Sequence, residues 1–536
     1  MDMNEQPTEP QREDQLAPGH VPSQQQSTPS PAAEKGARRV GGLSRRKLFI
    51  GLAAAGTAAA VGSGVALEQW TQHGGLKPPL QGPVEGNIQI GHLLRRAGFG
   101  ATPQEISSYA ALGYNGAVDR LINYQQVSDD AMEQRLKSLN LDLTTLRDQQ
   151  LWWLLRMAWT QRPLLEKMTL FWSGHFTSSF RSVGKAKERM ITQNQFLRNH
   201  AFDTFDNLLS GITADPAMLV YLNLTQSTKK APNENYAREL MELFTLGLGH
   251  YTQQDVYEGA AALTGWHVVG QTTTSRYLEQ THNDQIKTYL GHTGNLDYKN
   301  VINILANHPA TPWFICRKLF TFFAYENPSD DDVKPLVDTY VKSNHNMGEV
   351  MKQLLLSPQF SSAKAYRSRV KSPTEFAIGA YRTLNIQSDG TGLPAGMTSM
   401  GQALFDPPNV AGWPGDKSGS LWLNSGTWMA RLNFINQLLL RGTGSGKVLQ
   451  PLDLQGIINQ NHIDSPEHFV DYFVSFLLDG QLNQDRKASL VDYFTTNDSA
   501  TNKVRQITLT NSKSYPINRV RGTLYLLMAL PEYQLN

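Results

Sequence analysis

The chain has 536 residues, of which 40% are hydrophobic and 18% charged, and its formal net charge is +2. This composition is typical of a large globular protein with a sizeable core, and the near-neutral balance argues against a nucleic-acid-binding protein. The single cysteine, Cys316, excludes an intramolecular disulfide framework and Cys-based zinc sites, so a metal would need His, Asp and Glu ligands. Cys316 lies in an apolar helical pattern and is predicted to be an inert core residue.

The N-terminal residues predict a tail followed by an export signal. Residues 1–41 are rich in Gln, Pro, Ser, Glu and Ala and lack aromatic residues, which predicts disorder. Residues 42–67 resemble a twin-arginine export signal, because Ser44-Arg45-Arg46-Lys47 precedes the uncharged stretch 48–67. That stretch is also long enough to span a bilayer, so cleavage after Ala66 and retention as a transmembrane anchor are both open. Either form implies the twin-arginine export machinery and a periplasmic, extracellular or cell-envelope location.

The rest of the chain predicts a mainly α fold with a multi-helix globular core and long irregular loops, because strand-like alternation is scarce. We expect a linker at 68–87, a core domain at 88–440 and a C-terminal helical segment at 441–536. Helical periodicity is strongest at 141–160, 164–176, 301–323, 334–343, 347–356, 374–384 and 521–531. Capping patterns predict helix starts at Asp215 and Thr252 and helix ends at Gly247 and Gly265, and they assign Asp255 to a capping box.

Two irregular regions interrupt this pattern. Residues 270–298 predict a long loop that holds a short hairpin. Residues 405–424 combine glycines and prolines with Trp413 and Trp422, which either line a pocket or fill the core. Asn409 and Trp413 are therefore candidate binding residues.

Five sequence blocks resemble a large bacterial family catalogued as domain of unknown function 1800. They are residues 92–103 (HLLRRAGFGATP), 170–176 (LFWSGHF), 232–240 (PNENYAREL), 251–266 (ending LTGW) and 405–415 (FDPPNVAGWPG). The resemblance implies an exported protein, since members are mostly predicted to be secreted, often with twin-arginine signals. It also implies a secreted sulfatase-like partner protein, because a second exported family of that kind is often encoded beside it. It implies no reaction.

One segment departs from the family pattern of a His-Asp pair followed by a glycine, a lysine and Leu-Gly. Here Asn283 separates His282 from Asp284, and the glycine is missing before Lys287. His282 and Lys287 are candidate binding residues, but a joint action of His282 and the carboxylate on one group is in question.

The helix of the third block carries a polar face made of Asn235, Arg238, Glu239 and Glu242, which share an arc of about 100°. Carboxylates at i and i+3 can chelate a divalent metal or divide acid and base roles, and an arginine beside them can bind an anionic substrate. Arg238, Glu239 and Glu242 are candidate catalytic residues and Asn235 a candidate binding residue. The alternatives are a solvated face with an Arg238–Glu242 pair, or a buried ion-pair network.

Among the histidines, His175 is the leading candidate for a catalytic residue. It lies on an apolar helix face, where a hydrogen-bonded core histidine is the alternative, and the catalytic interpretation predicts Glu239 or Glu242 as its partner. His250 and His267 flank the helix at 252–264 and are further candidate ligands. Neither a nucleophile elbow nor a glycine-rich phosphate loop is present in the sequence.

Two functions fit these residues. The first is an extracytoplasmic enzyme, hydrolytic and assisted by a divalent metal, built on the His/Glu/Arg cluster. The second is a non-catalytic envelope or scaffold protein that acts with the sulfatase-like partner.

Overall fold

Helices dominate the chain, so the mainly α prediction is confirmed, and a computed structural model describes residues 84–440, 452–496 and 504–536. The tail predicted at 1–41, the signal predicted at 42–67 and nearly all of the linker predicted at 68–87 lie outside these residues. In the described ranges no helix combines the length and apolar character needed to span a membrane.

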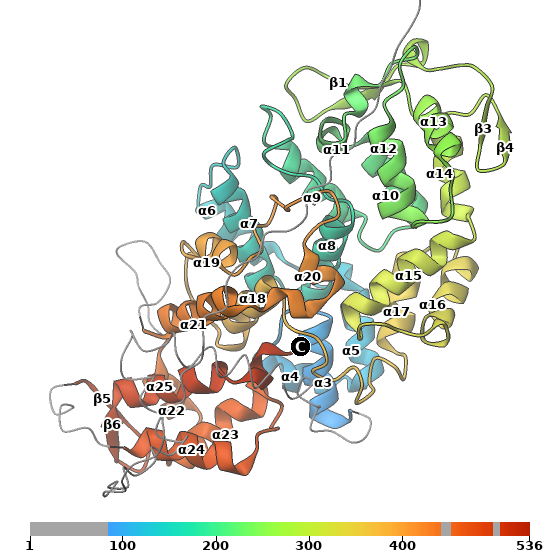
Figure 1. The fold of residues 1–536 in the computed structure, drawn as a ribbon. Helices are drawn as coiled ribbons and strands as arrows, with labels where there is room; N and C mark the ends of the chain where they lie inside the picture. The colour runs from blue at the N-terminus through green and yellow to red at the C-terminus, as the bar shows by residue number, and fades with distance from the viewer. Residues whose placement is uncertain (1–83, 441–451, 497–503) are drawn as a thin grey trace, which may run out of the picture. The chain divides into compact units, whose positions relative to one another are not determined.

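The helices differ widely in length, and Figure 1 shows their arrangement. In the first half of the chain they are α3 (Gly86–Arg96), α4 (Pro103–Ala110), α5 (Gly113–Ile122), α6 (Asp130–Ser138), α7 (Leu146–Trp159), α8 (Pro163–His175), α9 (Arg189–Asn199), α10 (Phe205–Ala214), α11 (Pro216–Tyr221), α12 (Glu234–Glu239) and α13 (Gln253–Ala262). They continue as α14 (Tyr298–Asn307), α15 (Ala310–Phe323), α16 (Asp330–Lys342), α17 (Met347–Leu355), α18 (Pro373–Thr383), α19 (Leu393–Ser399), α20 (Pro414–Lys417), α21 (Ser425–Leu440), α22 (Leu454–Gln460), α23 (Pro466–Leu477), α24 (Gln484–Thr495) and α25 (Ile517–Met528).

Short elements connect the helices. A π-helix, η3 (Leu240–Thr245), follows α12 directly, and 3-10 turns lie at η1 (Tyr124–Gln126), η2 (Leu224–Gln226), η4 (Glu279–Thr281), η5 (Gly419–Trp422) and η7 (Pro531–Gln534). The strands form antiparallel pairs: β1 (Trp266–Val268) with β2 (Ser275–Tyr277), β3 (Lys287–Tyr289) with β4 (His292–Gly294), and β5 (Gln506–Thr508) with β6 (Ser514–Pro516).

Local signals predicted the ends of helices well. The Asp215 side chain accepts a hydrogen bond from the backbone N–H of Met218 at 2.9 Å, and Thr252 forms the predicted capping box with Asp255. Gly247 and Gly265 both have positive φ after the segments that they were predicted to end.

Of two predictions about longer segments, one was wrong, and the other, a loop with a short hairpin, was confirmed but incomplete. The helix predicted at 301–323 is two helices, α14 and α15, because Pro309 disfavours helical backbone at His308 and interrupts the run. The loop predicted at 270–298 contains the β3–β4 hairpin, and also the second strand of another hairpin, β1–β2, whose first strand begins earlier, at Trp266.

The apolar side chains gather in two clusters. The first hydrophobic cluster is formed mainly by α3, α5, α8 and α10 to α17. The second hydrophobic cluster joins α7, α18, α19 and α21 to the C-terminal helices α22 to α25. Helix α8 takes part in both, since Phe171 belongs to the first cluster and Leu170 to the second, and Phe322 of α15 packs against both.

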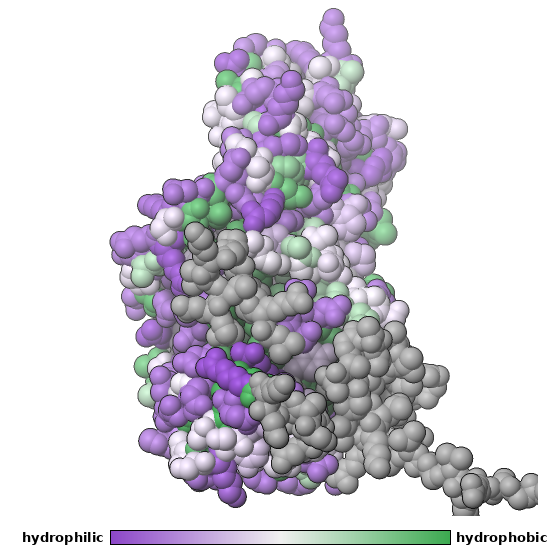
Figure 2. All heavy atoms as spheres, turned by 90° about the vertical axis from the view of Figure 1, so that its left-hand side faces the viewer, coloured by the Kyte–Doolittle hydropathy of each residue, from purple (hydrophilic) through white to green (hydrophobic). Residues whose placement is uncertain are grey.

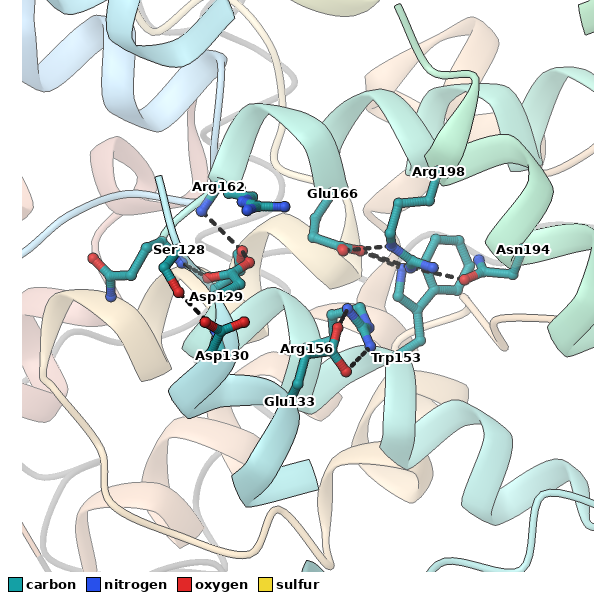
Figure 3. Close-up of polar contacts among 12 residues, drawn as sticks. Ser128, Asp129, Asp130, Glu133, Trp153, Arg156, Arg162, Glu166, Asn194 and Arg198 are labelled. Carbon is teal, nitrogen blue, oxygen red and sulfur yellow. Dashed lines mark hydrogen bonds and ion pairs between the residues drawn. The ribbon is translucent and has the colours of Figure 1, made fainter. Parts of the chain in front are cut away.

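A buried polar network fixes α8 against its neighbours (Figure 3). Glu166 of α8 accepts hydrogen bonds from Arg198 of α9 at 2.6 and 2.9 Å and from the indole N–H of Trp153 of α7 at 3.0 Å. Arg198 also donates to Asn194 at 2.8 Å. Because these buried charges are paired and hydrogen-bonded, the network holds three helices in one register.

On the face shown in Figure 2 the described residues that are in view are mostly hydrophilic, and hydrophobic ones appear among them in small groups. The large exposed apolar side chains are scattered over different elements: Leu112, Leu248, Tyr257, Val269, Ile286, Val341, Leu356 and Leu421. Leu248 is the most exposed of them, at 75%.

Candidate functional site

A cavity of about 810 Å³ lies where α8, the residues after η3, α15 and α20 meet. Its apolar lining includes Leu170, Phe171, Leu246, Trp313, Phe314 and Phe322. Its polar lining includes His175, His308, Arg317, Lys318, Asp416 and Lys417. Mainly apolar walls with a few convergent polar groups, at this volume, are typical of small-molecule sites.

Two glycines allow the loop before α20 to lie against the end of α8. A Cβ on Gly174 would be 3.1 Å from Oδ2 of Asp416, and a Cβ on Gly412 would be 2.9 Å from the carbonyl oxygen of Gly174. Gly412 also has φ +80°, which an L side chain rarely adopts. The second and fifth family blocks therefore meet in space, and their contact brings Asp416 to the cavity.

His175 is the last residue of α8 and is 3% exposed. Its Nε2 is 3.0 Å from the carbonyl oxygen of Phe244, and its Nδ1 is 2.8 Å from Nζ of Lys318. Because a carbonyl only accepts, Nε2 carries the proton and Nδ1 accepts from the lysine. Burial, and then the charge of Lys318, hold the pKa of His175 well below its usual value, so the ring is neutral.

Lys318 projects from α15 into the same cavity. Burial lowers its pKa to about 7, and the positive charge of Lys417 acts in the same direction while Asp416 opposes it. Besides His175, its Nζ donates to the carbonyl oxygen of Leu243 at 3.4 Å. A neutral amine has two hydrogens and one lone pair, so these two acceptors use both hydrogens and leave the lone pair without a partner.

Two carboxyl groups line the cavity: Asp330, which is exposed and pairs with Arg317, and Asp416 of α20. Burial raises the pKa of Asp416 to about 7. The positive charges of Arg369 and Lys318 lower this pKa, and the negative charge of Glu375 raises it. The Asp416 carboxyl has no hydrogen-bond partner among the described residues. Lys318 and Asp416 thus face one cavity, each shifting the pKa of the other without forming an ion pair.

The polar face of α12 and η3 lies outside the residues that line this cavity. Arg238 donates to Glu234 and to Gln253, both at 3.0 Å, and Glu242 accepts from the hydroxyl of Tyr251 at 2.6 Å. The predicted Arg238–Glu242 pair is therefore wrong. The wider turn of the π-helix, which begins at Leu240, changes the angular position of Glu242 relative to Arg238.

The predicted partner of His175 is also wrong, since Lys318 and Phe244 occupy both ring nitrogens and neither Glu239 nor Glu242 contacts it. Glu239 is half-buried, and burial and the charge of Glu242 raise its pKa against the effect of Arg238. Asn235 is exposed on α12.

The residues of the departing segment stabilise the local backbone. His282 is buried with Nδ1 3.1 Å from the carbonyl oxygen of Thr264, and Asp284 forms an exposed ion pair with Lys229. Lys287 is buried and donates to the carbonyl oxygen of Gln285 at 2.8 Å and to the side chain of Asn295 at 3.4 Å. Neither His282 nor Lys287 lines the cavity.

The remaining candidate residues lie in different places: some in turns, one in the core and one at the cavity. Asn409 accepts a hydrogen bond from the backbone N–H of Ala411 at 2.9 Å and is exposed, and Trp413 is buried in the second hydrophobic cluster. His267 is hydrogen-bonded to Thr281, whereas His250 lines the cavity beside His308. Burial raises the pKa of the Cys316 thiol, as expected for an inert core residue.

Nowhere in the described ranges do three or more His, Cys, Asp or Glu side chains come close enough to hold one metal ion. The two residues that sequence reasoning missed are Lys318 and Asp416. The available signals were weak: Lys318 is a charged residue in the apolar run of 312–323, and Asp416 directly follows the fifth family block.

The fold and the cavity define a helical protein with a partly buried amine and carboxyl in one pocket. The chain belongs to the family described as "Protein of unknown function (DUF1800)", which matches residues 92–535. The match includes the C-terminal helices that pack into the second hydrophobic cluster. No curated protein and no solved structure matches the chain.

Proposed function

We propose that the protein is an enzyme and that the cavity between α8, α15 and α20 is its active site. One observation carries the proposal: the amine of Lys318 and the carboxyl of Asp416 face the same cavity, and both have a pKa of about 7. At neutral pH a substantial fraction of molecules then holds a neutral amine and a protonated carboxyl. These are the states required of a general base and a general acid.

A hydrolytic reaction fits this pair of groups. The lone pair of Lys318 would remove a proton from water or a substrate hydroxyl, and Asp416 would protonate the leaving group. His175 acts through Lys318 as a positioning residue, because it accepts a hydrogen bond from Nζ and its own proton is held by Phe244. The side chains of Glu239 and Glu242 take no part in these steps.

Two further proposals come from the sequence. Residues 42–67 support a location outside the cytoplasm, reached through the twin-arginine machinery. The alternative function, a scaffold acting with a sulfatase-like partner, depends on the family resemblance and stays a prediction.

The proposal is tested by turnover measurements on the full chain with chromogenic carboxylic esters, phosphate esters and glycosides. Lys318→Met and Asp416→Asn should each reduce turnover at least about a hundredfold, the usual contribution of acid–base groups. Lys334→Met is the matched control, because Lys334 is exposed and pairs with Asp338 on α16. Full turnover in Lys318→Met would contradict the proposal.

A further inference from the structure

The proposed active site contains an amine with a free lone pair, which suggests a reaction beyond proton transfer. We infer that Lys318 forms a covalent imine with an aldehyde or ketone substrate, and that Asp416 supplies the proton with which water departs. This inference adds a covalent reaction with a carbonyl substrate to the hydrolytic use of the same two groups, and it rests on the proposed function because it requires this cavity to be an active site.

The contacts of Nζ orient the amine for attack. In the neutral amine its two hydrogens are donated to Nδ1 of His175, which also lines the cavity, and to the carbonyl oxygen of Leu243. No carboxylate pairs with Nζ within the described ranges, so no partner holds it as an ammonium ion. The lone pair of the neutral amine is then left without a partner at a residue that lines the cavity, so it is free to attack a substrate.

The surroundings favour loss of water and retention of the product. Phe171, Phe314 and Phe322 line the cavity, and Nζ lies 5.1 Å from the centroid of the Phe314 ring. Apolar walls disfavour the charged ammonium form before the reaction. The face of Phe314 stabilises a positive charge at this nitrogen, whether it belongs to the ammonium ion or, after the reaction, to the protonated imine.

The step balances with the groups present. Nζ attacks the carbonyl carbon, the π electron pair moves to oxygen, and that oxygen takes the proton of Asp416. The nitrogen returns one proton to the Asp416 carboxylate, which gives a neutral carbinolamine. Asp416 then protonates the hydroxyl group, water leaves, and the nitrogen lone pair forms the C=N bond. The protonated imine keeps one N–H, which still donates to Nδ1 of His175.

The test uses the full chain, 3-phenylpropanal as the probe and sodium cyanoborohydride at pH 7, with alkylation of each lysine measured by peptide mass spectrometry. At pH 7 about half of the Lys318 amine is neutral if its pKa is about 7, whereas the neutral fraction of an ordinary lysine is about a thousandfold smaller. We expect Lys318 to be alkylated at least about tenfold faster than Lys334. Equal rates would overturn the inference.

Asp416→Asn separates the covalent step from simple amine reactivity. In this variant, alkylation of Lys318 by the aldehyde should slow at least about tenfold, while acetylation by N-acetoxysuccinimide, which needs no loss of water, should not slow. The thermal unfolding midpoint confirms that the variant is folded. If Lys318 of the wild-type chain is acetylated rapidly but not alkylated, the imine inference fails and the proposed base survives. If it is neither acetylated nor alkylated faster than Lys334, both fail.

Discussion

Gly412 and Gly174 are in backbone contact: a Cβ on Gly412 would lie 2.9 Å from the carbonyl oxygen of Gly174. This contact joins the loop before α20 to the end of α8, and it sets the position of Asp416 relative to Lys318. Gly113 offers a comparison, because it also has positive φ but a Cβ there would meet no atom within 4 Å.

We expect Gly412→Ala to destabilise the protein more than Gly113→Ala. In both variants an alanine must adopt a left-handed backbone, which costs about 1 kcal/mol. Gly412→Ala adds an overpacking cost of about 1–3 kcal/mol. Urea unfolding of the two variants measures the difference. Equal losses of stability would show that the loop is not held against α8 in this way.

Asp416→Asn should stabilise the protein at high pH. The carboxyl has a pKa of about 7 in the folded chain against 3.8 as its ordinary value, so the folded state binds more protons between these limits. Wild-type stability therefore falls as pH rises from about 4 to 7, and the Asn variant lacks this loss, which amounts to roughly 2–4 kcal/mol. In urea unfolding at pH 5 and pH 8, the free energy of unfolding of the variant should increase relative to that of the wild type as the pH rises. The same difference at both pH values would mean that Asp416 is not held as a neutral acid in the folded chain.

His175→Gln should weaken the acid sensitivity of the fold. The pKa of His175 is well below 6.5 in the folded chain, so the unfolded state binds the extra proton when pH falls below about 6.5. Protonation of His175 in the unfolded state then lowers the free energy of unfolding of the wild type by up to about 1.4 kcal/mol per pH unit. The stability difference between wild type and variant should shrink between pH 7 and pH 5. A difference that grows on acidification would require a protonated His175.

The buried pair of Lys167 on α8 and Glu375 on α18 gives a prediction about the stability of the fold, and the charges of both residues also act on Asp416. The positive charge of Lys167 is the main effect that lowers the pKa of Glu375, to about 2, despite burial, and burial lowers that of Lys167 to about 8. Glu375→Gln should cost about 3–5 kcal/mol, because it leaves a buried amine without its carboxylate. The double variant Lys167→Met/Glu375→Gln should recover part of this loss in chemical unfolding. A single variant as stable as the wild type would show that the pair is not buried as an ion pair.

The helices and their caps could be predicted because they depend on neighbouring residues. Asp215 and Thr252 cap the helices that their sequence contexts indicate. The cavity could not be predicted, because Lys318 and Asp416 lie on separate elements and meet only through the packing of both against α8. Periodicity also assumed a regular α-helix through Glu242, and the π-helix at Leu240 altered the predicted face.

The most direct measurement is the pH dependence of acetylation of Lys318, followed by peptide mass spectrometry with Lys334 as the internal reference. We expect a midpoint of about 7 for Lys318. Because the charge of Lys417 lowers the pKa of Lys318 and that of Asp416 raises it, Lys417→Gln should raise the midpoint and Asp416→Asn should lower it. A midpoint near 10 in the wild type, as for an exposed lysine, would contradict the assignment of Lys318 as the base of an active site.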